Sequence, residues 1–146
     1  MLPQVNYLAV LVAGIVIFLL GGLWYSPVLF AKKWIALQGR TEEQMRAGTA
    51  GSNMPLMYFG AFLCGLIIAW AIAVLANHFP PAVSISTGEW AMRGAKLGLF
   101  CWFGFAASTS FANGIFSMKP KQLWVIDSGY NLVSFVLAGI ILMVWR

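Results

Sequence analysis

The polar residues of this chain that could do chemistry lie inside long apolar runs. Asp127, Asn131 and Ser134 are spaced at i, i+4 and i+7, so a helix places them on one stripe, which Ala138 continues. Asp127 is the only acid well inside such a run. Polar side chains are unfavourable in hydrocarbon, and they often mark a binding site or an ion path. The stripe therefore predicts a candidate site for a proton or a cation.

A second set of polar residues is predicted at the same depth as Asp127. A tight turn at residues 114–121 should fold the preceding helix back, which brings its hydroxyl and amide groups toward the carboxylate. These groups belong to Ser108, Thr109, Ser110 and Asn113. The structural alternative is that the cluster only joins helices. Polar contacts between membrane helices contribute about 0.6–2 kcal/mol each.

Another polar cluster is predicted at the opposite end of the helices. It comprises Asn77, His78, Glu89, Arg93 and Lys96. Glu89 and Arg93 have the spacing of a helical ion pair, while Ser86 and Glu89 have that of a capping box, which gives Glu89 a structural role. A lone histidine at a helix end is rarely a metal ligand. We therefore predict no metal site and no cofactor.

No catalytic motif accompanies these clusters. The sequence contains no H-E-x-x-H zinc motif, no nucleophile elbow, no phosphate loop and no C-x-x-C. Its two cysteines, Cys64 and Cys101, lie in apolar runs, where cysteine usually behaves as a small apolar residue. We therefore predict a protein that is not an enzyme.

The elements that must position these residues are expected to be transmembrane helices. Of 146 residues, 61% are hydrophobic and 9% are charged, whereas a soluble domain is about half apolar and a quarter charged. A spanning helix needs roughly 20 mostly apolar residues. Four runs qualify, at residues 5–25, 55–77, 87–113 and 122–145, with the Trp and Tyr near their ends that are typical of interfacial belts. The sequence predicts one all-α integral membrane domain over residues 1–146, a four-helix bundle.

The first connection, residues 26–54, is predicted to hold two short helices. Phe30, Trp34 and Leu37 recur at helical spacing beside two lysines, which indicates an amphipathic helix lying in the headgroup region. Residues 41–44 have the pattern of a capping box and should open a second short helix.

The distribution of basic residues predicts the orientation. The net charge is +5. The first and third connections carry Lys32, Lys33, Arg40, Arg46, Lys119 and Lys121, whereas the terminal side carries Arg93, Lys96 and Arg146. The positive-inside rule then places residues 26–54 in the cytoplasm and both termini on the opposite side of the membrane. Because these bases lie at helix ends and form no patch on a soluble surface, the expected partner is membrane lipid and not nucleic acid.

Small residues recur at every fourth position and predict close helix packing. Ala61, Gly65, Ala69 and Ala73 form one such stripe. Gly94 with Gly98, and Gly104 with Ser108, have the same spacing. Such stripes let helix backbones approach each other in lipid. The pattern leaves open whether the partner helix belongs to the same chain or to another subunit.

Two functional hypotheses follow from these patterns. The first is a non-enzymatic inner-membrane protein that works as a homo-oligomer or as an accessory subunit of a larger membrane complex. The alternative is a small transporter or channel whose polar path runs around Asp127 and Asn131.

Three short elements carry a resemblance to a known family. They are Asn6-Tyr7 at the start of the first span, Trp24-Tyr25-Ser26-Pro27 at its end, and the run from Ser128 to Ser134 in the last span. Together they resemble the bacterial membrane family called domain of unknown function 1761. The resemblance covers the whole chain. It implies a small four-helix bacterial membrane protein and implies no activity.

Overall fold

The computed structural model describes residues 4–78 and 84–145, whose regular elements are all helices, with no strand among them. The elements are α1 (Tyr7–Trp24), α2 (Ala31–Leu37), α3 (Glu42–Thr49), α4 (Met54–His78), α5 (Thr87–Cys101), the π-helix η1 (Trp102–Ala107), α6 (Ser108–Phe116) and α7 (Lys121–Val144). Since α5, η1 and α6 run on without a break, they form one long helix.

Four of these segments are long and apolar enough to cross a membrane. They are Tyr7–Trp24, Met54–His78, Thr87–Phe116 and Lys121–Val144. All four coincide closely with the predicted runs. The third is longer than predicted because Gly114 does not end the helix. The chain instead turns at 117–120, where Met118 has a positive φ of 53° and Pro120 precedes α7.

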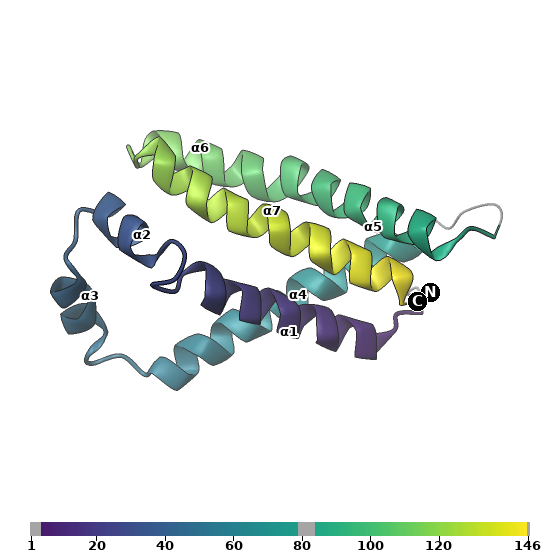
Figure 1. The fold of residues 1–146 in the computed structure, drawn as a ribbon, viewed down its shortest axis with the longest axis horizontal. Helices are drawn as coiled ribbons and strands as arrows, with labels where there is room; N and C mark the ends of the chain where they lie inside the picture. The colour runs from purple at the N-terminus through teal and green to yellow at the C-terminus, as the bar shows by residue number, and fades with distance from the viewer. Residues whose placement is uncertain (1–3, 79–83, 146) are drawn as a thin grey trace.

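Helix α7 lies at the centre of the bundle. It packs along α5, α1 and α4, and its first turns also contact α2. Figure 1 shows the two ends of the chain together at one end of the bundle, with α2 and α3 at the other. The short connection helices therefore lie at the same end as the turn between α6 and α7.

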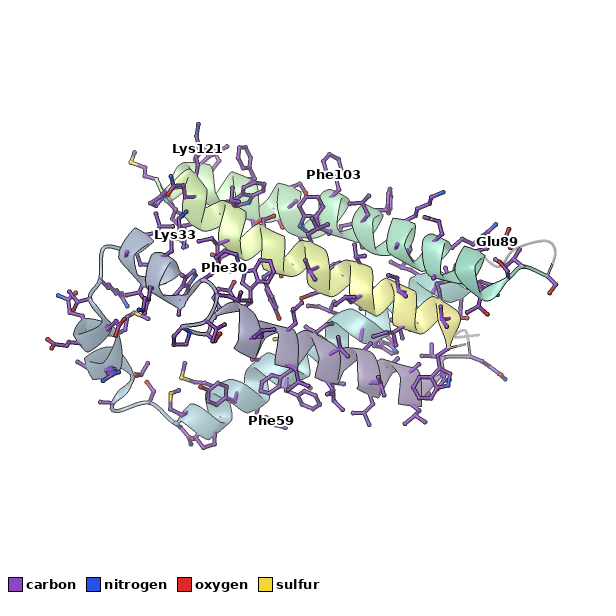
Figure 2. All side chains as sticks on the ribbon, viewed as in Figure 1. Phe30, Lys33, Phe59, Glu89, Phe103 and Lys121 are labelled. Carbon is purple, nitrogen blue, oxygen red and sulfur yellow. The ribbon has the colours of Figure 1, made fainter. Side chains whose placement is uncertain are left out.

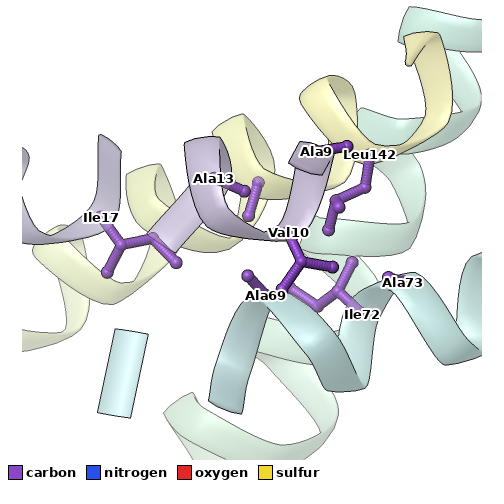
Figure 3. Close-up of a cluster of buried hydrophobic side chains, with 9 residues drawn as sticks. Ala9, Val10, Ala13, Ile17, Ala69, Ile72, Ala73 and Leu142 are labelled. Atoms are coloured by element: carbon purple, nitrogen blue, oxygen red, sulfur yellow. The ribbon is translucent and has the colours of Figure 1, made fainter. Parts of the chain in front are cut away.

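The core is built largely from small side chains, which let the helices come close. Ala9, Ala13 and Ile17 of α1 pack with Ala69, Ile72 and Ala73 of α4 and with Ala138 and Leu142 of α7 (Figure 3). Gly65 of α4 faces α1 at the Gly14 carbonyl oxygen, which would lie 3.3 Å from an added Cβ. The small-residue stripe of α4 thus packs against a helix of the same chain.

The pair Gly94 and Gly98 marks the tightest helix crossing. A Cβ on Gly94 would overlap the backbone of Gly139 in α7, and a Cβ on Gly98 would overlap that of Phe135. The partner of this stripe is also internal. Gly104 differs, because an added Cβ there would have no heavy atom of the described residues within 4 Å.

Both predicted capping boxes are present. The Thr41 hydroxyl accepts from the Gln44 backbone N–H at 3.2 Å and opens α3. Ser86 and Glu89 open α5 in the same way. Glu89 Oε2 accepts from both the backbone N–H and the hydroxyl of Ser86, each at 2.8 Å. The capping box holds this carboxylate at the helix start, and Arg93, at the spacing predicted for an ion pair, interacts with it electrostatically.

Candidate functional site

The candidate site centres on the carboxylate of Asp127, in the second turn of α7. Its Oδ1 accepts a hydrogen bond of 2.8 Å from the Tyr25 hydroxyl and one of 3.0 Å from Trp34 Nε1. The rings of Tyr25 and Trp34 meet edge to face with their centroids 5.4 Å apart. These three residues, which we call the Asp127 clasp, join the end of α1 and the helix α2 to α7.

The turn after α1 brings Tyr25 and Trp34 to the same carboxylate. Pro27 disfavours helical geometry at Ser26, whose hydroxyl instead donates to the Leu23 carbonyl at 2.7 Å. The backbone N–H of Phe30 then donates back to the Trp24 carbonyl at 3.2 Å. The chain therefore folds under the end of α1, and α2 begins beside the first turns of α7.

Tyr25 is held as a neutral donor in this arrangement. It follows the apolar span of α1. Burial of its ring, and after that the hydrogen bond to Asp127, raise the pKa of the Tyr25 hydroxyl above its usual value. The phenol therefore keeps the proton that it donates to the carboxylate.

Indole groups bind the backbone of α7 on either side of Asp127. Trp24 Nε1 donates to the Ile126 carbonyl at 3.0 Å, and Trp102 Nε1 donates to the Ser128 carbonyl at 2.9 Å. Trp102 is the first residue of η1, and π-helical turns are common at functional sites. Buried indole N–H groups need an acceptor, so these bonds fix α7 against both α1 and η1.

An aromatic cavity lies beside the clasp, between α1, α4 and α7. It has a volume of about 410 Å³ and is lined by Tyr25, Tyr130, Phe18, Tyr58 and small residues of α1 and α4. The Tyr130 hydroxyl donates to the Ile17 carbonyl at 3.2 Å. The Tyr130 ring lies 5.6 Å from that of Tyr25.

The hydroxyl groups predicted to hold Asp127 bind their own helix instead. Ser108 donates to the Gly104 carbonyl at 2.8 Å, Thr109 to the Phe105 carbonyl, and Ser110 to the Ala107 carbonyl at 3.1 Å. Hydroxyls on a helix readily bond the carbonyl one turn earlier. The prediction that they are donors to Asp127 is therefore wrong, and Tyr25 and Trp34 take that role.

Part of that predicted cluster does lie near the carboxylate. Ser110 and Asn113 line a cavity of about 220 Å³ together with Asp127 and Lys119. Ser110 also accepts a 3.0 Å hydrogen bond from Trp124 Nε1 of α7. The turn between α6 and α7 therefore brings polar groups of the two helices to one cavity, as predicted.

The stripe that begins at Asp127 does not stay open along α7. Asn131 is half-buried, Ser134 is 1% exposed and Ala138 is 0% exposed. The Ser134 hydroxyl has no hydrogen-bond partner among the described residues. Beyond Asn131 the polar stripe runs into the packed core.

The second predicted cluster has local partners. Asn77 Nδ2 donates to the Gln4 carbonyl at 2.9 Å and to the Ala73 carbonyl at 3.1 Å. His78 Nδ1 lies 2.8 Å from the Val74 carbonyl oxygen, and Glu89 serves its capping box. Arg93 and Lys96 are exposed. Among the described residues, no three metal-binding side chains are grouped for a metal ion.

Asn6, one of the residues that carry the family resemblance, has a structural role at the start of α1. Asn6 caps α1 by accepting from the Leu8 and Ala9 N–H groups, each at 3.1 Å, and its Nδ2 donates to the Trp145 carbonyl at 3.3 Å. Tyr7 is exposed. The Asn6 side chain therefore caps α1 through Oδ1 and links the start of α1 to the end of α7 through Nδ2.

The chain matches a known family over most of its length. Residues 8–143 match the model of a family described as "Protein of unknown function (DUF1761)". Neither the curated proteins nor the solved structures compared with this chain give a significant match.

Proposed function

This chain belongs to the DUF1761 family, whose description assigns no function, and we propose that it is a non-enzymatic integral membrane protein that assembles with itself in the bacterial inner membrane. The observation that carries the proposal is the outer face of its third span. The Asp127 clasp serves the fold of each subunit, and the outer face of the third span joins one subunit to the next.

The outer face of the third span carries an unfilled stripe of small residues. Gly104, Ser108 and Ala112 are spaced at every fourth position, and all three are exposed. We call this stripe the assembly face. Exposed aromatic side chains surround it, at Phe103, Phe105 and Phe111. In this span 11% of the residues of an apolar 18-residue stretch are buried, against 28% or more in the corresponding stretches of the other three candidate spans.

The two other small-residue stripes named above each meet a helix over at least part of their length. Gly94 and Gly98 receive the backbone of α7, and the α4 stripe at Gly65 receives α1. Small residues allow the backbone of a second helix to approach closely and pack against the groove. Lipid tails do not pack into such a groove as well. A second copy of the chain would fill the assembly face in the same way.

The hydroxyls on this face do not oppose close approach. Ser108 donates to the Gly104 carbonyl and Thr109 to the Phe105 carbonyl. Since their hydrogen atoms are already used within the helix, a partner helix can cover them without leaving a donor unpaired.

The packing of α7 favours assembly over the transport alternative. A polar path around Asp127 and Asn131 would have to pass Ser134 and Ala138, which are 1% and 0% exposed. Beyond them Gly139 lies against the backbone of Gly94. Hydrogen bonding between helices explains the polar groups at Asp127 better than a transport path does.

The proposed orientation follows the charges at the two ends of the bundle. Lys33 and Lys121 lie at one end, whereas Glu89 lies at the other (Figure 2). Anionic lipid of the cytoplasmic leaflet attracts each basic residue near the surface by about 1 kcal/mol. We therefore propose that residues 26–54 and the turn after α6 face the cytoplasm.

Co-purification of two differently tagged copies from mild detergent tests self-assembly, with blue-native electrophoresis to give the size. We expect the two tags to co-purify and the complex to run as a dimer or larger. Gly104→Leu should reduce both signals strongly. Gly60→Leu is the matched control, because Gly60 is also helical and also has no heavy atom of the described residues within 4 Å of an added Cβ.

Two outcomes would contradict the proposal. One is a wild-type protein that runs as a clean monomer at native expression. The other is a larger complex that contains one copy of the chain, which would support the accessory-subunit hypothesis instead.

A further inference from the structure

Two cavities meet between α6 and the first turns of α7. One has a volume of about 220 Å³ and reaches Asp127. The other has a volume of about 290 Å³ and lies toward the turn. Both are lined by Gly114, Lys119 and Trp124, so they are neighbours, and we call the pair the groove.

The inner part of the groove contains polar groups that the fold leaves unused. Both hydrogen bonds to Asp127 go to Oδ1, and Oδ2 accepts none from the described residues. Asn113 and Lys119 line the same cavity. Lys119 and Asp127 form no ion pair within the described residues. The carboxylate and the ammonium group therefore line the cavity without pairing with each other.

The outer part of the groove is apolar with a basic rim. Phe111, Ile115 and Met118 line it together with Lys119 and Lys121. Figure 2 shows Lys121 at the end of the bundle. Asp127 lies six residues further along α7, which corresponds to about 9 Å along the helix axis. The carboxylate of Asp127 therefore borders the inner cavity, Lys121 borders the outer one, and Lys119 borders both.

A zwitterionic lipid would complement these charges if its positive group lay beside Asp127 and its negative group lay beside the lysines. We propose that the groove binds one phospholipid with a primary-amine headgroup, of the phosphatidylethanolamine type. Its ammonium group would reach Asp127 Oδ2 and the Asn113 amide oxygen, its phosphate would lie between Lys119 and Lys121, and an acyl chain would follow Phe111 and Ile115.

The chemistry of the inner cavity selects the amine headgroup over the other common ones. A primary ammonium has three N–H donors for a carboxylate and an amide oxygen. A quaternary ammonium has no N–H donor, and proteins usually bind it in an aromatic cage. A glycerol headgroup carries no positive charge for Asp127. The groove therefore distinguishes ethanolamine from choline and glycerol headgroups.

Native mass spectrometry of the purified full chain in detergent measures this preference. Phosphatidylethanolamine, phosphatidylcholine and phosphatidylglycerol with identical acyl chains would be titrated separately. We expect one bound phosphatidylethanolamine, about tenfold tighter than either of the other lipids. Ethanolamine lipids with one and then two N-methyl groups should bind progressively more weakly, and this series needs no variant protein.

Variants then locate the site. Asp127→Asn keeps an oxygen acceptor for Tyr25 and Trp34, and it should bring the affinity for phosphatidylethanolamine down to that for phosphatidylcholine. Lys119→Gln combined with Lys121→Gln should weaken binding of all three lipids. Glu89→Gln removes an acid at the other end of the bundle and is the matched control, with no expected change.

Several results would overturn the proposal. Equal binding of ethanolamine and choline lipids, or unchanged selectivity in Asp127→Asn, would exclude recognition of the ammonium group. Preference for phosphatidylglycerol would indicate a simple basic surface. Displacement of the lipid by an equal concentration of soluble glycerophosphoethanolamine would exclude a role for the apolar part of the groove.

Discussion

The hydroxyl of Tyr25 donates a 2.8 Å hydrogen bond to Oδ1 of Asp127, across a separation of 102 positions in the chain. Trp34 Nε1 donates to the same oxygen at 3.0 Å. The one acid deep in the last apolar run therefore holds the end of the first helix and the short helix α2. A polar side chain that is unfavourable in hydrocarbon therefore connects the end of α1, helix α2 and helix α7.

Removal of the Tyr25 hydroxyl should weaken the bundle. Tyr25→Phe keeps the ring packing but removes one donor to a carboxylate, so the free energy of unfolding should fall by about 1–2 kcal/mol. Unfolding in mixed detergent micelles measures this change. Tyr7→Phe is the control, because Tyr7 is 72% exposed. Equal effects of the two substitutions would refute a role for the hydrogen bond.

Loss of the Trp34 N–H should release α2 and leave the long helices intact. Helix α2 has no buried residue, so its bond to Asp127 is a main attachment. In Trp34→Phe the amides of residues 31–37 should exchange hydrogen about tenfold faster, which corresponds to about 1.4 kcal/mol. Trp70→Phe, at an exposed indole in α4, should leave this exchange unchanged. Unaltered exchange in Trp34→Phe would show that α2 is held by other contacts.

The crossing of α5 and α7 should not tolerate a methyl group. Gly98→Ala places a Cβ against the Phe135 carbonyl, and overpacking of this kind destabilises by about 1–3 kcal/mol. Thermal unfolding of the purified protein measures the effect. Gly60→Ala should be neutral or slightly stabilising, because that site is open and alanine favours a helix. A fully stable Gly98→Ala protein would contradict the close approach.

The proposed orientation predicts which connections a reagent can reach from outside the cell. Single cysteines at Ser52 and Ser84, both exposed, can be introduced in a Cys64→Ala, Cys101→Ala background. A membrane-impermeant thiol reagent should label residue 84 and not residue 52 in intact cells. The reverse pattern would overturn the orientation, and labelling of both would indicate dual topology.

The helices themselves could be predicted closely from the sequence. Long apolar runs fix where spanning helices can lie, and the spacing of Thr41 with Gln44 and of Ser86 with Glu89 predicted two helix starts that the structure contains. The end of the third helix was missed because Gly114 suggested a turn, whereas the chain turns only before Pro120.

The site was predicted only in part. Asp127 stands out in any hydropathy profile, but its donors depend on how the helices are rotated against one another. The spacing of Gly94 and Gly98 predicted a close helix contact, but it left open that the partner is α7 of the same chain. The sequence places Trp24 in an interfacial belt and Trp34 on an amphipathic helix in the headgroup region, whereas in the structure they donate to α7 at Ile126 and Asp127. Their position beside the Ser26-Pro27 turn was the available signal.

Oxidative cross-linking in native membranes tests self-assembly through the third span most directly. A single cysteine replaces Ser108 on the assembly face, and another replaces Leu19, which is 63% exposed on α1, each in the Cys64→Ala, Cys101→Ala background. A disulfide requires Cα atoms within about 7 Å, so it forms only where two copies meet closely. We expect rapid formation of a covalent dimer at residue 108 and little at residue 19. A protein that stays monomeric at residue 108, or that cross-links equally at both positions, would contradict assembly through this face.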